Sequence, residues 1–326
     1  MSNSNLKIGI YVDVANIVKN GGYGMQFDVL REFACRDGSE PLRMNAYVSY
    51  DEDRAKDDWE YRNKTQGYFA ALRELGYKLI QKTVRWYTDD NGNRFGKANS
   101  DLDMAVDALL QSENLDRVLM VTGDGDFIQV VRALQNKGCR VEVLAFDNVS
   151  QDLTREADLF ISGYLVPGLL PIRSPEGRGG WGDIDSRVRG YCYHYDHAKG
   201  FGFVRFLSAI QSGLWITDTR NPDSPYRTAF CHETQLPAGF DAKQLPSRRH
   251  VFEFTLRDSG PDRDPQAQDL KLMGVGRASG TFGQNSHAQS IGNTGNANGL
   301  GNRQVPIADE DDFGDEVADD NIGNTL

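Results

Sequence analysis

Residues 117–146 read RVLMVTGDGDFIQVVRALQNKGCRVEVLAF. The apolar runs Arg117–Thr122 and Arg140–Phe146 predict two buried strands. The residues between them, Asp126–Asn136, predict a helix that ends at Gly138. A strand, a helix and a second strand in this order form the unit from which parallel sheets are built. The stretch therefore predicts an α/β fold.

The segments that precede this unit continue the alternation of strands and helices. Apolar or alternating runs predict strands over residues 6–12, 44–50 and 77–87. Apolar residues at helical spacing predict helices over residues 27–35, 57–75 and 100–110. The whole series predicts a parallel sheet with helices on both faces.

Composition divides the chain into four parts. We expect an α/β domain over residues 1–173, followed by a linker rich in Pro and Gly over 174–187. Residues 188–276 have strand-like patterns and no long helical period, which predicts a small β-barrel. Residues 277–326 are poor in apolar side chains and end in an acidic run, so we expect this tail to be disordered.

The net charge of −11 is concentrated in the tail. Residues 305–326 contain eight acidic residues and no Lys or Arg, which leaves a net charge of −3 for residues 1–304. The charge of the folded part therefore does not exclude a nucleic-acid partner. The tail itself has three interpretations: a solubilising end, a segment that contacts the protein's own barrel, or a segment that binds a protein partner.

The cysteines and the N-terminal sequence predict a compartment. The four cysteines have no CxxC spacing, no signal segment precedes Leu6, and no apolar run approaches 18 residues. We therefore expect a soluble cytoplasmic protein with reduced thiols and no membrane contact. A zinc site built from Cys192, His194, His197 and the Cys231–His232 pair is disfavoured because its spacing is irregular.

Aspartates follow two of the predicted strands. Asp13 comes directly after residues 6–12, and Asp124 and Asp126 come directly after Arg117–Thr122. Ligands of such folds bind at the carboxyl ends of parallel strands, so we expect these side chains to meet at one edge. Carboxylates about 5 Å apart repel by about 3 kcal/mol per pair at an effective dielectric of 20. Mg²⁺ or Mn²⁺ would relieve this repulsion, because both cations prefer oxygen ligands.

The helix over residues 100–110 offers further carboxylates. Asp101 lies in its first turn, nearest the strand ends, and is the preferred ligand. Asp107 is the second choice, and Asp103, on the same helix face as Asp107, is expected to be solvated. The alternative interpretation is that all these aspartates are helix caps and turn formers.

The sequences YVDVANI (11–17), SDLDMAVDAL (100–109), VTGDGDFIQVVRALQNKG (121–138) and SQDLTREADLF (150–160) occur in order. Together they resemble the NYN domains of the LabA-like group, relatives of PIN nucleases, over roughly residues 5–165. The resemblance implies a PIN-like fold, a closing helix near 150–160, and metal-dependent RNA cleavage. It also implies that Asp13, Asp101, Asp124 and Asp126 are the acidic site residues. Asn16 and Thr122 fall on the accompanying polar positions.

The second domain carries the sequence GYCYHYDHAKGFGFV over residues 190–204. This stretch and AFCHE (229–233) resemble the RNA-binding motifs of cold-shock domains. Alternation places Phe201 and Phe203 on one face, where their rings can stack on bases. The expected RNA-binding residues are His194, Lys199, Phe201, Phe203, Phe230 and His232. We also expect Arg205 to contact phosphates.

These patterns favour a metal-dependent ribonuclease that cuts single-stranded RNA internally. The barrel would then be the domain that binds the RNA. The rival is a non-catalytic RNA-binding regulatory protein with a degenerate acidic pocket. A sugar-nucleotide site built on Asp124-Gly-Asp126 is a weaker alternative, because the chain lacks room for an acceptor domain. A homodimer, and DNA as a second substrate, are left open by the sequence.

Overall fold

A computed structural model describes residues 5–88, 94–97, 100–172, 179–261 and 263–274. The tail predicted over residues 277–326 lies outside this part of the chain, as do residues 174–178 of the predicted linker. Within the described residues, no helix is both long and apolar enough to span a membrane.

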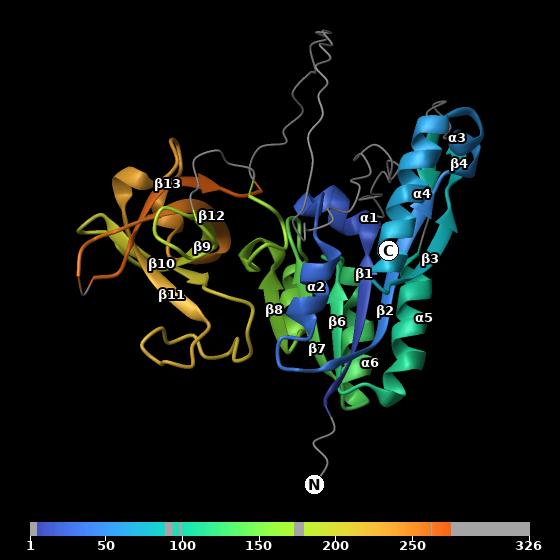
Figure 1. The fold of residues 1–326 in the computed structure, drawn as a ribbon, viewed down its shortest axis with the longest axis horizontal. Helices are drawn as coiled ribbons and strands as arrows, with labels where there is room; N and C mark the ends of the chain where they lie inside the picture. The colour runs from blue at the N-terminus through green and yellow to red at the C-terminus, as the bar shows by residue number, and fades with distance from the viewer. Residues whose placement is uncertain (1–4, 89–93, 98–99, 173–178, 262, 275–326) are drawn as a thin grey trace, which may run out of the picture.

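The N-terminal half contains a six-stranded sheet in the order β3-β2-β1-β6-β7-β8 (Figure 1). Every neighbouring pair in it is parallel. The strands are β1 Lys7–Asp13, β2 Glu40–Tyr50, β3 Lys78–Thr83, β6 Arg117–Val121, β7 Arg140–Ala145 and β8 Leu159–Ser162. The predicted parallel α/β fold is therefore confirmed.

Helices cover both faces of this sheet. They are α1 Val14–Ile17, α2 Phe27–Ala34, α3 Glu52–Asp57, α4 Trp59–Glu74, α5 Asp101–Gln111, α6 Ile128–Asn136 and α7 Gln151–Glu156. Neighbours along β1 show why two layers form. Ile10 and Val12 belong to the core cluster that contains α2 and α4, whereas Tyr11 belongs to the cluster that contains α5 and α6. Side chains that alternate between two apolar faces are typical of a sheet buried on both sides.

Two short elements differ from the sequence expectation. The predicted closing helix over 150–160 ends at Glu156, and β8 follows it at Leu159–Ser162. Asp158 explains the change, because its backbone N and its carboxylate both bond to the backbone of Val141 and dock this segment on β7. The predicted strand 77–87 is divided into β3 and β4 Arg85–Thr88, and β4 pairs only with β5 Arg94–Lys97.

Residues 187–272 form a closed barrel in the order β10-β11-β13-β12-β9. The strands are β9 Arg187–Asp196, β10 Phe201–Leu207, β11 Tyr226–His232, β12 Ser247–Arg257 and β13 Gln266–Leu272. Only the β11–β13 pair is parallel. The barrel has its own apolar interior, in which Phe206, Phe252 and Phe254 are fully buried.

The barrel packs directly against the α/β domain. Tyr191, Leu207 and Tyr226 of the barrel share one hydrophobic cluster with Tyr164 and Leu169 of the α/β domain. Within the expected linker, the Trp181 indole N–H donates to the Leu207 carbonyl at 2.7 Å. The two parts are therefore joined by a packed contact as well as by the linker, because apolar side chains on both parts are buried together.

A buried network of charges supports the amino-terminal side of the sheet. Glu142 on β7 is 1% exposed and accepts two hydrogen bonds from Arg36, at 2.8 and 2.9 Å. Arg117 lies 3.8 Å from Glu142 and donates twice to Asp37. Burial raises the pKa of Asp37, but the hydrogen bonds from Arg117 and Ser39 outweigh it and hold that pKa at about 2.

The substitution Glu142→Gln should destabilise the protein by about 3–5 kcal/mol, because it leaves buried arginines without their counter-charge. Urea unfolding followed by circular dichroism measures the change. The control is Glu156→Gln, which removes an exposed ion pair with Arg132 and should cost less than about 1 kcal/mol. Equal losses in both variants would contradict the assigned role of Glu142.

Candidate active site and nucleic-acid interface

The strand order of the sheet reverses between β1 and β6. Ligands of parallel α/β folds bind at such a switch point, outside the carboxyl ends of the strands. Val12 on β1 pairs with Val121 on β6. Asp13, the last residue of β1, and Thr122, directly after β6, therefore lie side by side at the carboxyl edge of the sheet.

Asp13 is buried at this edge and is 5% exposed. Its Oδ1 accepts a hydrogen bond from the backbone N of Asn16 at 3.1 Å, so it is the N-cap of α1. Its Oδ2 lies 3.5 Å from the Thr122 hydroxyl, which donates to it. The sequence explains this arrangement, because an apolar strand is followed at once by a residue that starts a helix.

Further hydrogen bonds tie the two strand ends together. The Asn16 side-chain oxygen accepts from the Gly123 backbone N at 3.0 Å. The Thr122 hydroxyl oxygen accepts from the Asp124 backbone N at 3.2 Å, and Asp124 Oδ1 accepts from the Asp126 backbone N at 2.9 Å. Thr122 thus contacts Asp13 through its hydroxyl and fixes the backbone at Asp124. The Asn16 and Thr122 side chains thus both contact the turn after β6, and their role in a site stays a prediction.

Gly125 lets the turn after β6 pack closely on α7. A Cβ at this position would lie 2.9 Å from the Ser150 hydroxyl oxygen. Ser150 caps α7 by accepting from the Leu153 backbone N. The glycine therefore serves packing here, and any larger residue would push the turn away from α7.

Asp126 lies in a different environment from Asp13. It is exposed and lines a pocket of about 530 Å³ with Arg132, Asp152, Arg155 and Glu156, among others. Neither Asp13 nor Asp124 lines this pocket. The pocket's arginines pair with its own carboxylates, Arg132 with Glu156 and Arg155 with Asp152. The expected convergence of Asp126 with the other aspartates stays a prediction.

The three aspartates of α5 have different surroundings. Asp101 is partly buried and opens the helix. Asp103, expected to be solvated, is partly exposed and forms an ion pair with Lys82 at 2.5 Å. Asp107 accepts a hydrogen bond from the Tyr47 hydroxyl at 2.9 Å. Because it is six residues beyond Asp101, it lies about 9 Å further along the helix axis. The hydrogen bond explains Asp107 without a metal.

The donor set at the switch point consists of oxygen atoms. Within the described residues, no three His, Cys, Asp or Glu side chains come together as a group that could hold a metal. The expected cage of four or five carboxylates is therefore not formed there. Mg²⁺ differs from other metals in that one or two protein carboxylates and several waters suffice to bind it. Asp13, Asp124 and the Thr122 hydroxyl fit that more modest requirement.

Asp51 was not predicted from the sequence as a site residue. It comes directly after β2, much as Asp13 ends β1, is 7% exposed, and caps α3 by accepting from the Asp53 and Arg54 backbone N atoms. Its other oxygen accepts from the Trp86 indole N–H at 2.8 Å. The sequence pattern that could have identified Asp51 is an aspartate between an apolar strand and a helix.

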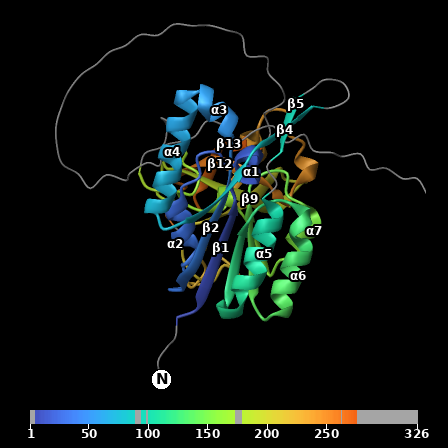
Figure 2. The same ribbon diagram turned by 90° about the vertical axis from the view of Figure 1, so that its right-hand side faces the viewer.

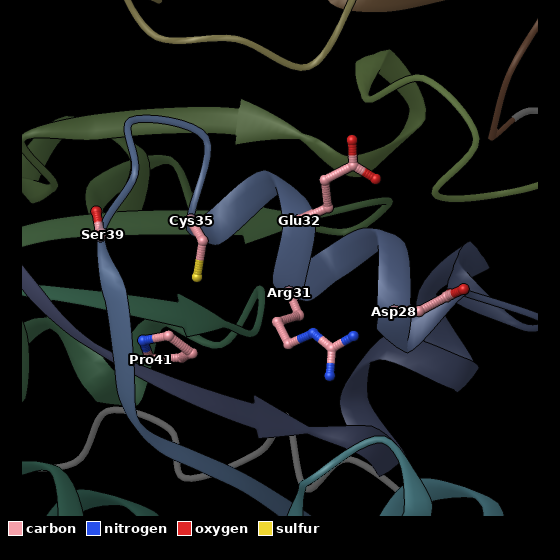
Figure 3. Close-up of a pocket in the computed structure, with 6 residues that line it drawn as sticks. All are labelled: Asp28, Arg31, Glu32, Cys35, Ser39 and Pro41. Carbon is pink, nitrogen blue, oxygen red and sulfur yellow. The ribbon is translucent and has the colours of Figure 1, made fainter.

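A second pocket, of about 530 Å³, lies between α2 and the start of β2 (Figure 3). Its lining residues are Asp28, Arg31, Glu32, Cys35, Ser39 and Pro41. Ser39 and Pro41 place it at the amino-terminal end of β2, the end away from the switch point. Burial raises the pKa of the Cys35 thiol, which disfavours a nucleophilic role.

The predicted aromatic face of the barrel is present. Phe201, Phe203 and Phe230 are partly exposed, with ring centroids 5.5–6.1 Å apart. The exposed His194 ring lies 6.1 Å from Phe203. Register explains the cluster, because Phe203 pairs with both Phe230 and His194 across the ladder. Side chains of directly paired residues lie on one face of a sheet.

Polar residues border this face. His232 is exposed and pairs with Phe201 across the ladder. The Lys199 ammonium group lies 5.9 Å from the Phe201 ring centroid and 3.5 Å from an Asp196 carboxylate oxygen. Basic side chains beside aromatic rings are typical of single-strand binding sites, and the RNA-binding role of these residues stays a prediction.

Arg205 does not belong to this face, which corrects the sequence expectation. It is 8% exposed, its guanidinium lies 4.1 Å from the Tyr193 ring centroid, and it donates to the Tyr191 hydroxyl at 3.3 Å. The Tyr226 ring centroid lies 5.9 Å from the same guanidinium. A guanidinium enclosed by tyrosines is a structural cation–π contact.

The buried thiols of the barrel have structural surroundings. The Cys192 thiol contacts the His194 carbonyl, and burial raises its pKa to about 11. Burial likewise raises the pKa of Cys231 to about 12. Both side chains belong to the apolar interior of the barrel.

The chain is similar to several known proteins over its N-terminal half. The low amplitude and bright protein LabA of Synechococcus elongatus is 29% identical over 162 residues, which are 48% of this chain and 82% of that protein. A crystal structure of a protein of unknown function from Vibrio parahaemolyticus is 25% identical, with a TM-score of 0.40, and covers 50% of this chain and 95% of its own. The family model of the NYN domain matches residues 7–170, from the start of β1 to just beyond the sheet. Since this match spans half of the sequence, the chain belongs to the NYN domain family.

Proposed function

We propose that the protein is a ribonuclease that depends on a divalent metal ion and cuts single-stranded RNA internally. The observation that carries the proposal is the pair Asp13 and Asp124 at the switch point between β1 and β6, joined through Thr122. Membership of the NYN family supports an RNA-related role for this edge.

Asp13 and Asp124 would hold Mg²⁺ or Mn²⁺, with Asp101 as a further carboxylate from the first turn of α5. When bound, such an ion lowers the pKa of a water molecule and stabilises negative charge on the phosphate. The protein's own residues set the geometry. Thr122 orients the Asp13 carboxylate and the Asp124 backbone, and Asn16 fixes the Gly123 backbone beside them. The reaction adds water across a phosphodiester bond and releases two RNA fragments.

The barrel would hold the RNA. Its closed five-stranded order and its aromatic face support the resemblance to cold-shock domains. Each base stacked on an aromatic ring contributes about 1–3 kcal/mol, whatever its sequence. Lys199 and the histidines at the border supply the polar contacts.

Two observations favour a second function. Asp13 already serves as a helix cap, and no group of three metal-binding side chains exists in the described part of the chain. These facts suit a non-catalytic RNA-binding regulator, whose aspartates stabilise the turns at the sheet edge. Such a protein would bind RNA with strong salt dependence and leave it intact.

Asp124→Asn should reduce metal-dependent cleavage at least about a hundredfold, because it removes several kcal/mol of charge stabilisation at the phosphate. The measurement is the decay of end-labelled single-stranded RNA with Mg²⁺, with Mn²⁺ and with EDTA. Asp103→Asn is the control, since Asp103 pairs with Lys82 and is not among the proposed metal ligands. RNA that is bound but never cut under any metal condition would favour the regulator instead.

Phe201→Ala combined with Phe230→Ala should weaken RNA binding by about 2–6 kcal/mol if each ring stacks one base. Fluorescence anisotropy in EDTA measures binding without cleavage. Trp215→Ala is a matched control, because Trp215 is a 70% exposed aromatic that lies on the insertion between β10 and β11. Equal weakening by the control would argue against a dedicated aromatic face.

A further inference from the structure

The β4–β5 hairpin stands outside both the sheet and the barrel. β4 follows the edge strand β3 almost directly, and the last backbone bond to the sheet runs from Val84 N to the Tyr50 carbonyl at 2.9 Å. The hairpin therefore extends past the carboxyl ends of the strands. Figure 2 shows it at the end of the sheet where α1 follows β1. This is the edge that carries the proposed active site.

Trp86 anchors the hairpin to that edge. Its indole N–H donates to the buried carboxylate of Asp51, directly after β2, at 2.8 Å. Asp13 on the neighbouring strand β1 is level with Tyr47 of β2. Asp51 is four residues further on, so the anchor lies about 13 Å beyond Asp13 along the strand direction.

Alternation turns Arg85 and Tyr87 to the face opposite Trp86. Both are exposed, Tyr87 to 46%. One face of β4 thus presents a basic and an aromatic side chain two residues apart.

We propose that the hairpin face with Arg85 and Tyr87 is a second contact for single-stranded RNA, separate from the barrel. This inference rests on the proposed function, because it places RNA at the sheet edge. A base stacks on Tyr87, and a phosphate accepts hydrogen bonds from Arg85. Arg85 is available for this role, since it pairs with no carboxylate within the described residues. Trp86 is a positioning residue that holds the hairpin through Asp51.

The test is RNA binding by the full chain, measured by fluorescence anisotropy of a labelled uridine-rich single strand in EDTA. Arg85→Ala combined with Tyr87→Ala should raise Kd about tenfold or more, as expected for one stacked base and one charged contact. The control combines Arg43→Ala with Leu110→Ala. It also removes one exposed arginine and one exposed apolar side chain, but at the opposite end of the sheet. Its Kd should stay within about twofold of the wild type.

Tyr87→Phe separates stacking from a structural role of the hydroxyl, and should bind RNA as the wild type does. Photocrosslinking with 4-thiouridine RNA should label the peptide that contains Tyr87. If the barrel variants weaken binding while the hairpin variant binds as the wild type does, the hairpin inference is overturned and the proposed function stands. If the wild-type chain binds no single-stranded RNA, both are overturned. A dimer that the hairpin variant dissociates, with RNA affinity unchanged, assigns this face to self-association and also overturns the inference.

Discussion

The parallel pairing of β1 with β6 is the constraint on which the candidate site depends. It places Asp13 and Thr122 side by side, although they are far apart in the sequence. A shift of this register by one residue would turn Asp13 to the opposite face. Apolar residues on both faces of β1 prevent such a shift, because Ile10 and Tyr11 fill different core clusters. The packing of the sheet therefore sets the geometry of its edge.

The two ends of the sheet use charge in different ways. At the amino-terminal side, Glu142 is surrounded by arginines, so its charge is neutralised within the protein. At the carboxyl edge, Asp13 has hydrogen bonds from a backbone N–H and a hydroxyl among its partners. Glu142 thus joins arginines on one side of the sheet, whereas Asp13 takes part in the turns that connect two strand ends on the other.

Sequence patterns predict the strands next to the aspartates, because each is an apolar run with an acidic residue at its end or shortly after it. Asp13 and Asp124 could therefore be assigned to one edge before their surroundings were known. The role of Asp107 could not be predicted, because it depends on which strand α5 covers and on the reach of Tyr47. Arg205 is a similar case, since its tyrosine partners come from β9 and β11. Short elements such as β8 have too few residues to show a period.

The contact between the barrel and the α/β domain changes how the two parts would cooperate on RNA. A flexible tether would let the barrel present RNA to the sheet edge from many positions, at a cost in entropy. Here the Arg189 guanidinium of β9 donates to the Leu170 carbonyl at 2.7 Å and lies over Tyr164, within a shared apolar cluster. A packed contact fixes the distance between the aromatic face and the carboxylates. Under the proposed function, RNA that spans this distance would engage both sites at once, whereas a shorter strand would engage only one. Strand length would then determine affinity independently of base sequence.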